Sequence, residues 1–426
     1  MSTSVTKEYK DHFLDLALST SVPEETWLKE IRTEALESFK SLDFPTTRNE
    51  DWKYTRITPL LKKSFKKGQY AKVDYSKYQI TNLDAIVVPV VNGLINLSDL
   101  DLPKGIELLN IQTAKEKYAL YINQYFSKLA DNKNIFTALN TVSSTPYILK
   151  INDKVNNLKP IHFVFISKGE EVFVQPRFLV ISGKHSKFNV ITSFHSDSNI
   201  SFNNGVFEIV LEENAKLEWT KIQSENSESI HVSTEEAYMQ ANSTFILNTY
   251  TFNGGMVRNN VNVTIDASNC EANLNGLYIL DGKQHVDNHT KIAHKKAHSN
   301  SNELYKGIMD DASTAVFNGK VHVFKDAQKT NAFQSNKNIL LSDNATINTK
   351  PELEIYADDV KCSHGSTTGQ FDEDAVFYLR ARGIGEQSAR ALLVEAFAND
   401  VTEFLSLEAL KNHVLTLINK KLSKEI

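Results

Sequence analysis

The chain has 426 residues, of which 47 are lysine or arginine and 52 are aspartate or glutamate, so its formal net charge is −5. With this charge balance the chain lacks the excess of basic residues that is typical of nucleic-acid-binding domains. The sequence also contains no run of about 18 apolar residues that would span a membrane. Two cysteines are too few for a disulfide framework and fit a reducing compartment. With a polar N-terminus that lacks a signal-peptide core, these features predict a soluble cytoplasmic protein of two or three domains.

The first segment is predicted to be helical. Pro23, Glu24 and Glu25 form a favourable helix start, because proline suits the first helical position and carboxylates suit its positive end. Apolar residues then recur at every fourth position, at Trp27, Ile31, Ala35 and Phe39. The polar and aromatic segment 48–54 follows. We interpret it as a surface loop with two rings packed on the domain, and a binding role is the alternative.

The pattern then changes from helix to strand. Residues 80–111 are rich in valine and isoleucine around an Asn92-Gly93 turn signal, and a helix is predicted at about 115–129. From about 155 to 360 short alternating apolar runs replace any helical pattern. Small or polar positions precede these runs at a repeat of about 28 residues, at Ser186, Ala215, Ser243, Cys270 and His298. The repeat favours a β-helix, in which each coil buries the face of its neighbour, over a β-sandwich.

A histidine-rich segment lies within this repeat. His285, Asp287 and His289 alternate along the chain, and His294 and His298 follow. On a strand the first three would project to one face and could form a row of metal ligands. Their spacing matches no standard zinc pattern. A polar solenoid face with side chains hydrogen-bonded to one another is the structural alternative.

Residues 356–370 contain Cys362, one of the two cysteines, and His364 two positions later. An alternating pattern over 353–357 predicts a strand that ends before the glycines following His364. On an extended backbone the thiol and the imidazole would share a face. The pair suits zinc, copper(I) or iron–sulfur chemistry and equally a thiol nucleophile. Two ligands do not close a tetrahedral site, so a metal would need others from elsewhere. A strand-end thiol beside a surface histidine is the structural alternative.

The chain ends in helical patterns. Asp372, Glu373 and Asp374 suit a helix N-terminus, and apolar stripes continue through 376–397 and 407–422. The link at 382–385, Arg-Gly-Ile-Gly, superficially resembles a helix-hairpin-helix DNA module. In an acidic chain we instead interpret these helices as a docking surface for another protein.

Several long motifs, in order along nearly the whole chain, resemble the SufB/SufD family. They are residues 284–290, 303–307, 316–320, 327–330, 349–365 and 377–384. Upstream, residues 51–55, 136–140 and 176–177 resemble the SufD branch more than the SufB branch. Ser366 stands where relatives usually carry alanine. Serine is small like alanine, so this difference does not change the assignment of His364 by motif position.

The resemblance implies a non-catalytic scaffold subunit for iron–sulfur cluster assembly. The implied fold is mainly β, a right-handed parallel β-helix core flanked by N-terminal and C-terminal helical domains. The implied partners are a SufB-like subunit, paired through the β-helices, and a SufC-like ABC ATPase, bound by the C-terminal domain; the isolated subunit can form a homodimer. By motif position His364, with Cys362 before it, is the implied metal ligand for iron or a transient iron–sulfur cluster shared with the SufB-like partner. The sequence does not decide whether a flavin takes part.

These observations predict three domains: a mainly helical one with a small β segment at 1–145, the β-helix core at 146–365 and a helical one at 366–426. Three functions remain open on the residues alone. The first is the assembly scaffold, and the second is a thiol-dependent enzyme that uses Cys362 and His364. The third is a β-helix protein that binds or cleaves polysaccharides, which would normally be secreted. The chain lacks a phosphate-binding glycine loop and an oxyanion motif, which disfavours the enzyme.

Overall fold

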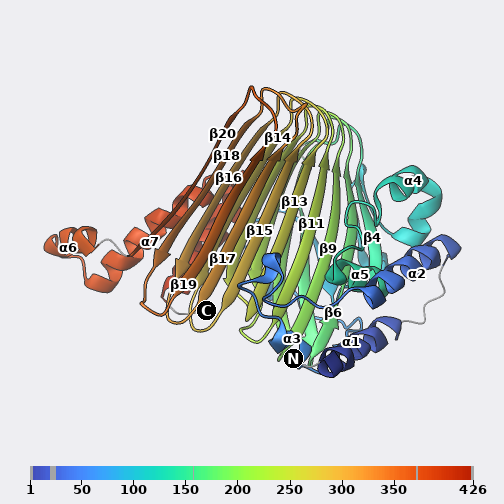
Figure 1. Ribbon diagram of the computed structural model, residues 1–426, viewed down its shortest axis with the longest axis horizontal. Helices are drawn as coiled ribbons and strands as arrows, with labels where there is room; N and C mark the ends of the chain where they lie inside the picture. Colours follow the sequence, from blue (N-terminus) through green and yellow to red (C-terminus); the bar gives the residue numbers. More distant parts are fainter. Residues whose placement is uncertain (1–2, 20–24, 157, 371–372, 424–426) are drawn as a thin grey trace.

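The computed structural model describes residues 3–19, 25–156, 158–370 and 373–423. Two long sheets run through the molecule, and helices lie at both ends of the chain (Figure 1). The predicted parallel β-helix with helical flanks is therefore confirmed. The helix start predicted at Pro23 and Glu24, and the acidic position Asp372, lie outside the described residues.

From β7 on, the strands alternate between the two sheets along the chain. Sheet A contains β1 (Lys66–Lys67), β3 (Ile106–Asn110), β4 (Thr145–Ile151), β6 (Val172–Val174), β7 (Pro176–Ser182), β9 (Ser201–Leu211), β11 (Ile230–Met239), β13 (Met256–Ile265), β15 (His285–His294), β17 (Thr314–Val323) and β19 (Thr346–Ile355). Sheet B contains β2 (Ile86–Val91), β5 (Ile161–Gly169), β8 (Lys187–Ser198), β10 (Lys216–Ser224), β12 (Thr244–Asn253), β14 (Glu271–Leu280), β16 (Asn300–Met309), β18 (Asn331–Leu340) and β20 (Lys361–Gln370). Each coil of the solenoid has one strand in each sheet. Among the described strands only β3 and β4 pair antiparallel, which excludes the β-sandwich.

The repeat of about 28 residues corresponds to one coil. Ser186, Ala215, Ser243 and Cys270 each directly precede a strand of sheet B, and the first residues of these strands are in register. Just before them the backbone takes a left-handed conformation at each corner, which asparagine tolerates well. Positive φ angles occur there at Asn214, Asn242, Asn269 and His298. The repeat in the sequence is therefore the repeat of a left-handed corner followed by a strand.

Apolar side chains fill the space between the sheets. Near the first coils the core is aromatic: the rings of Phe165 and Phe194 stack at 4.6 Å, and those of Phe178 and Phe207 at 5.6 Å. Successive coils place like residues above one another, because parallel strands in register align equivalent positions. The interior therefore forms one continuous core, with buried polar side chains such as Lys221 and Glu303 within it.

The helices cover the outer faces of the sheets. The N-terminal helices are α1 (Thr3–Leu18), α2 (Thr26–Ser41), α3 (Thr58–Leu61), α4 (Ile111–Tyr125) and α5 (Ile135–Ser143), and the short 3-10 helices are η1 (Glu50–Trp52), η2 (Ser76–Tyr78) and η3 (Leu97–Asp99). Helices α1, α2, α4 and α5 pack on sheet A. The C-terminal helices are α6 (Glu373–Ala381), α7 (Glu386–Thr402) and α8 (Glu408–Leu422). Of these, α7 and α8 pack on sheet B.

Helix α4 begins earlier than the predicted range of 115–129. The side chain of Asn110 accepts a hydrogen bond of 2.9 Å from the backbone of Gln112, so it caps the helix at its N-terminus. The apolar pattern alone did not reveal this cap.

The end of the solenoid differs from the prediction. We expected the last strand to end before Gly365, so that His364 would lie just beyond it. Instead residues 356–360 connect β19 to an additional strand, β20, and His364 lies inside that strand. The prediction was wrong because pairing with β18 keeps both glycines extended, although glycine is unfavourable within strands. The predicted domain limits remain a prediction; β20 continues past the limit at 365.

Candidate functional site

The last coil exposes the edges of both sheets. Strand β19 ends sheet A and β20 ends sheet B, and each pairs with one neighbour, β17 and β18 respectively. Most of β20 is exposed, and most of β19 is half-buried. An unpaired edge offers a row of backbone donors and acceptors, so this end of the solenoid can pair with a strand of another chain.

Cys362 and His364 both lie on the inward face of β20. Their neighbours in register on β18 are Ala332 and Gln334, which are buried in the solenoid interior. Cys362 is half-buried, and its side chain packs in a small apolar cluster that also contains Leu353. Burial raises the pKa of the Cys362 thiol. His364 is exposed, because no further coil covers it.

A column of polar side chains continues inward from His364. Gln334 lies next to it on β18, and Glu303 lies next to Gln334 on β16. The Gln334 amide donates a hydrogen bond to the Glu303 carboxylate, and both side chains are buried. Burial raises the pKa of Glu303 to about 7. The imidazole at the open end therefore stands in register with polar interior groups rather than with an apolar core.

No group of three or more histidine, cysteine, aspartate or glutamate side chains is arranged to hold a metal ion within the described residues. Cys362 and His364 are thus two possible ligands on one strand. The sequence correctly placed them on one face of an extended segment.

The histidine-rich segment is held by hydrogen bonds on the outer face of sheet A. His285 Nε2 lies 2.8 Å from the Thr55 hydroxyl, and His289 Nε2 lies 3.0 Å from the carboxylate of Asp287. Asp287 also accepts hydrogen bonds from Thr55 and Arg258. Burial alone would raise the pKa of Asp287, but Arg258 and His289 hold it well below its ordinary value. This is the hydrogen-bonded polar face that we gave as the alternative to a metal site.

The two later histidines lie elsewhere. His294 is fully buried and is hydrogen-bonded to the Ser301 hydroxyl at 2.8 Å. His298 lies in the corner before β16, with φ of 64°. The histidines that are close in sequence therefore occupy an outer face, the interior and a corner.

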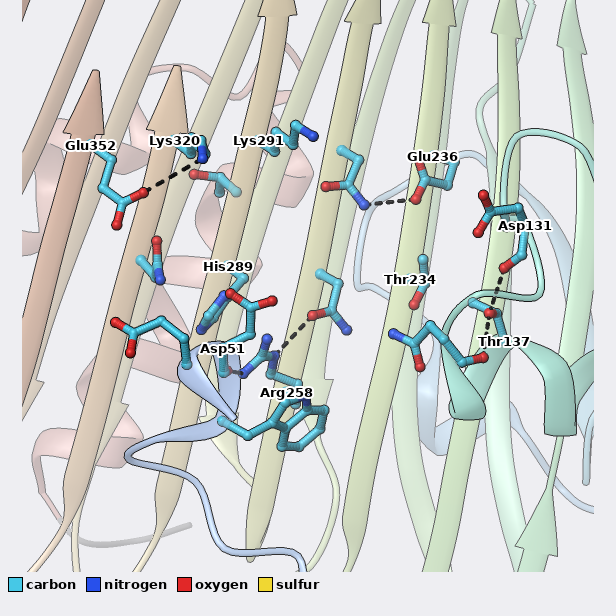
Figure 2. Close-up of a pocket in the computed structure, with 18 of the residues that line it drawn as sticks. Asp51, Asp131, Thr137, Thr234, Glu236, Arg258, His289, Lys291, Lys320 and Glu352 are labelled. Carbon is cyan, nitrogen blue, oxygen red and sulfur yellow. Dashed lines mark hydrogen bonds and ion pairs between the residues drawn. The ribbon is translucent and has the colours of Figure 1, made fainter. Parts of the chain in front are cut away.

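A polar cleft with a volume of about 470 Å³ lies over the outer face of sheet A (Figure 2). Two rows of side chains in register form its floor across strands β11, β13, β15, β17 and β19. One row is Glu236, Asn262, Lys291, Lys320 and Glu352, and the other is Thr234, Asn260, His289, Asn318 and Lys350. Residues 50–52 line one part of its wall, and residues from 130 to 137 line another.

Hydrogen bonds fix both walls. Arg258 Nη1 donates to the backbone oxygen of Asp51 at 2.7 Å, and its guanidinium lies 4.4 Å from the Trp52 ring centre. On the other wall the Thr137 hydroxyl donates to the backbone oxygen of Asp131 at 2.7 Å. Trp52 is buried as predicted for the 48–54 segment, whereas the ring of Tyr54 is largely exposed. The cleft is therefore a formed feature of the folded chain.

Sequence reasoning did not single out Glu236, Arg258 or Lys291. The available signal was the repeat itself: Asn262, Lys291 and Lys320 follow one another at one coil each. Polar residues at equivalent positions of successive coils form a row on one face of a solenoid. Arranging the sequence by coil, with the strand alternation, would have revealed the floor of the cleft.

Two family models match this β-solenoid with an open last coil. The model described as "SUF system FeS cluster assembly, SufBD core domain" matches residues 165–397. The model described as "SufBD protein N-terminal region" matches residues 3–162. The chain therefore belongs to the SufB/SufD family of iron–sulfur cluster assembly proteins.

Curated relatives agree with this placement. An iron–sulfur cluster assembly SufBD family protein of Synechocystis sp. is 32% identical over 409 residues, which cover 92% of this chain and 90% of the relative. The iron–sulfur cluster assembly protein SufD of Escherichia coli is 30% identical over 388 residues, 89% of each chain. A chloroplastic protein of Arabidopsis thaliana is 28% identical over 411 residues, 92% of this chain and 85% of the relative. The chain is thus a homologue of SufD. In its described part, no helix is both long enough and apolar enough to cross a membrane.

Proposed function

We propose that this chain is a non-catalytic, cytoplasmic scaffold subunit that pairs with a SufB-like subunit through its last coil. His364 then contributes a ligand to iron or to a nascent iron–sulfur cluster at the junction. The observation that carries this proposal is the position of His364, an exposed imidazole on the inward face of an edge strand that pairs only with β18. A second solenoid added at this edge would enclose the imidazole between the two chains.

The chemistry ranks His364 above Cys362. Iron binds a neutral imidazole, whereas a thiol must first lose its proton. Because burial raises the pKa of Cys362, the thiolate is disfavoured in the isolated subunit. The same effect disfavours a thiol-dependent enzyme. The iron or cluster is cargo in this proposal, and its remaining ligands come from the SufB-like partner.

The test is His364→Ala, co-expressed with SufB-like and SufC-like subunits. The complex should assemble, because one edge side chain is a small part of the interface, but its iron content and cluster-forming activity should fall at least about tenfold, as for loss of a metal contact. His364→Cys should restore part of the activity, since thiolate is also an iron ligand. Ser363→Ala, on the opposite face of the same strand, is the matched control. Normal cluster formation by His364→Ala would show that the histidine is not a ligand.

We further propose that the C-terminal helices contact the SufC-like ATPase. Helices α7 and α8 use apolar residues to pack on sheet B. Phe377 on α6 is nevertheless 73% exposed and Leu392 on α7 is 47% exposed. Tyr378, directly after Phe377, is also 56% exposed. Exposed apolar side chains that lie together are typical of a binding surface.

Single substitutions on α6 test this surface, because they leave α7 and α8 packed on sheet B. Phe377→Ser should weaken capture of the ATPase by about tenfold or more, as for an aromatic residue central to an interface. Leu120→Ser on α4 is the control, because Leu120 is 83% exposed and α4 packs on sheet A, away from the C-terminal helices. Pairing with the SufB-like subunit should be unchanged in both variants. Equal ATPase capture by Phe377→Ser and the unmodified chain would argue against this surface.

A further inference from the structure

The polar cleft over sheet A contains one lysine that is not neutralised. Lys320 lies 2.5 Å from Glu354, and Lys350 lies 2.8 Å from Glu50. Lys291 forms no ion pair with any described residue, although it stands in the same row as Lys320 (Figure 2). The free ammonium is therefore available to a ligand.

Lys291 stands beside a second lysine of the same row. Lys291 and Lys320 are direct neighbours in register on β15 and β17, and adjacent strands lie about 4.8 Å apart. Like charges at such positions repel each other. Glu352 and Glu354 offset the charge of Lys320, so Lys291 is the ammonium whose charge a bound anion would balance.

Neutral groups complete the floor. The amide of Asn318 and the hydroxyl of Thr234 form no hydrogen bond with other described residues, and both line the cleft. Asn318 lies on the strand next to that of Lys291, one row away. Together Lys291 and Asn318 offer an ammonium and an amide donor to the same ligand. This combination suits an oxyanion with several acceptor oxygens.

The end of the cleft over β11 carries the carboxyl group of Glu236, whose pKa is raised. Glu236 accepts a hydrogen bond of 2.7 Å from Asn262 Nδ2. Burial, with Glu208 and Asp131 nearby, raises its pKa to about 8, although Lys291 acts in the opposite direction. At neutral pH Glu236 is therefore largely uncharged, so that Asp131 is the other acidic side chain at this end of the cleft.

We propose that this cleft binds a small molecule that carries a phosphate group, with the phosphate at Lys291 and Asn318 and the uncharged part of the ligand toward Glu236. The volume of about 470 Å³ lies within the range of small-molecule sites. The floor is polar, so the ligand is hydrophilic rather than apolar. The site lies on the outer face of sheet A and does not involve His364.

Calorimetric titration of the full chain with pyrophosphate tests the proposal. We expect a dissociation constant below about 1 mM. Lys291→Gln should weaken binding at least about tenfold, because it removes a charge-assisted hydrogen bond, and Asn318→Ala should weaken it severalfold. Lys187→Gln is the matched control, since Lys187 is an exposed lysine of sheet B. Absence of binding at about 10 mM, or equal binding by Lys291→Gln, would overturn the proposal.

A second measurement tests whether the bound anion lies within electrostatic reach of Glu236. Sulfate keeps a constant charge between pH 6 and 9, so its affinity reports on the protein groups. Because ionisation of Glu236 adds a negative charge beside Glu208 and Asp131, sulfate binding should weaken as pH rises through about 8. Glu236→Gln should reduce this weakening while keeping the affinity at pH 7. An unchanged pH profile in Glu236→Gln would show that the anion binds outside the part of the cleft that contains Lys291 and Glu236, which would overturn the proposed site.

Discussion

The first and last coils of the solenoid end in different ways. At the first end β3 pairs antiparallel with β4, and the segment after β2 packs on the core through Ile95, Leu97, Leu100 and Leu102. At the last end β19 and β20 pair with one neighbour each, and their inward side chains are only partly covered. One end of the same repeating core is thus capped within the chain, and the other is left open.

In the function proposed above, the capped end stabilises the core and the open end associates with a partner. A solenoid needs capping of its terminal coils, since each coil is completed by the next. The capped end meets this need with apolar residues. The open end carries Thr349 and Ser366, whose hydroxyls lie 2.9 Å apart. These hydroxyl groups reduce the apolar surface that the open coil exposes, and the outer edges of β19 and β20 form no ladder with a described strand.

The largest expected loss of stability comes from shortening a core side chain near the capped end. Phe178→Ala should lower the free energy of unfolding by about 3–5 kcal/mol, because Phe178 is 2% exposed and stacked on Phe207. Ile347→Ala near the open end should cost about 1 kcal/mol, since Ile347 is half-buried against the same core. Urea unfolding of the two variants measures both. Equal losses would show that the two ends contribute alike.

A smaller effect is expected for the buried ion pair that holds segment 50–55 to sheet A. Asp287→Asn should lower the free energy of unfolding by about 3 kcal/mol, because it leaves the buried Arg258 without its counter-charge. Asp359→Asn removes an exposed pair with Lys329 and should change stability by less than about 1 kcal/mol. Chemical unfolding at pH 7 compares them, and a similar change in both would contradict the anchoring role of Asp287.

The third expected effect depends on pH and concerns the polar interior near the open end. The pKa of Glu303 is about 7 when folded against 4.5 ordinarily, so only the unfolded chain loses this proton between those values. The contribution of Glu303 to stability is therefore most favourable below about pH 4.5 and falls by up to about 3 kcal/mol as pH rises toward 7.

The test is Glu303→Gln, which should remove this decline. The gap in unfolding free energy between pH 5 and pH 8 should narrow by about 2 kcal/mol in the variant. Glu271→Gln, an exposed carboxylate on β14, is the control and should leave the gap unchanged. If the free energy of unfolding of Glu303→Gln still fell by the full amount between pH 5 and pH 8, titratable groups other than Glu303 would be responsible.

Much of the fold could be predicted from the sequence because its information is local and repeated. A left-handed corner and an alternating strand recur in every coil, so Asn242, Ser243 and the strand after them predict the same structure as Asn269, Cys270 and the next strand. Alternation also assigned Cys362 and His364 to one face. The long motifs then placed the chain in its family.

The tertiary structure decided what lies next to what. No local pattern shows that Thr55 and Arg258 converge on Asp287, or that residues 50–52 form a wall of a cleft on sheet A. Nor did the glycines after His364 reveal a strand, because pairing with β18 outweighs their weak strand propensity. The physical reason is that alternation and corners depend on neighbours in the chain. Burial, ion pairs and strand edges depend on which coils stack, and on where the stacking stops.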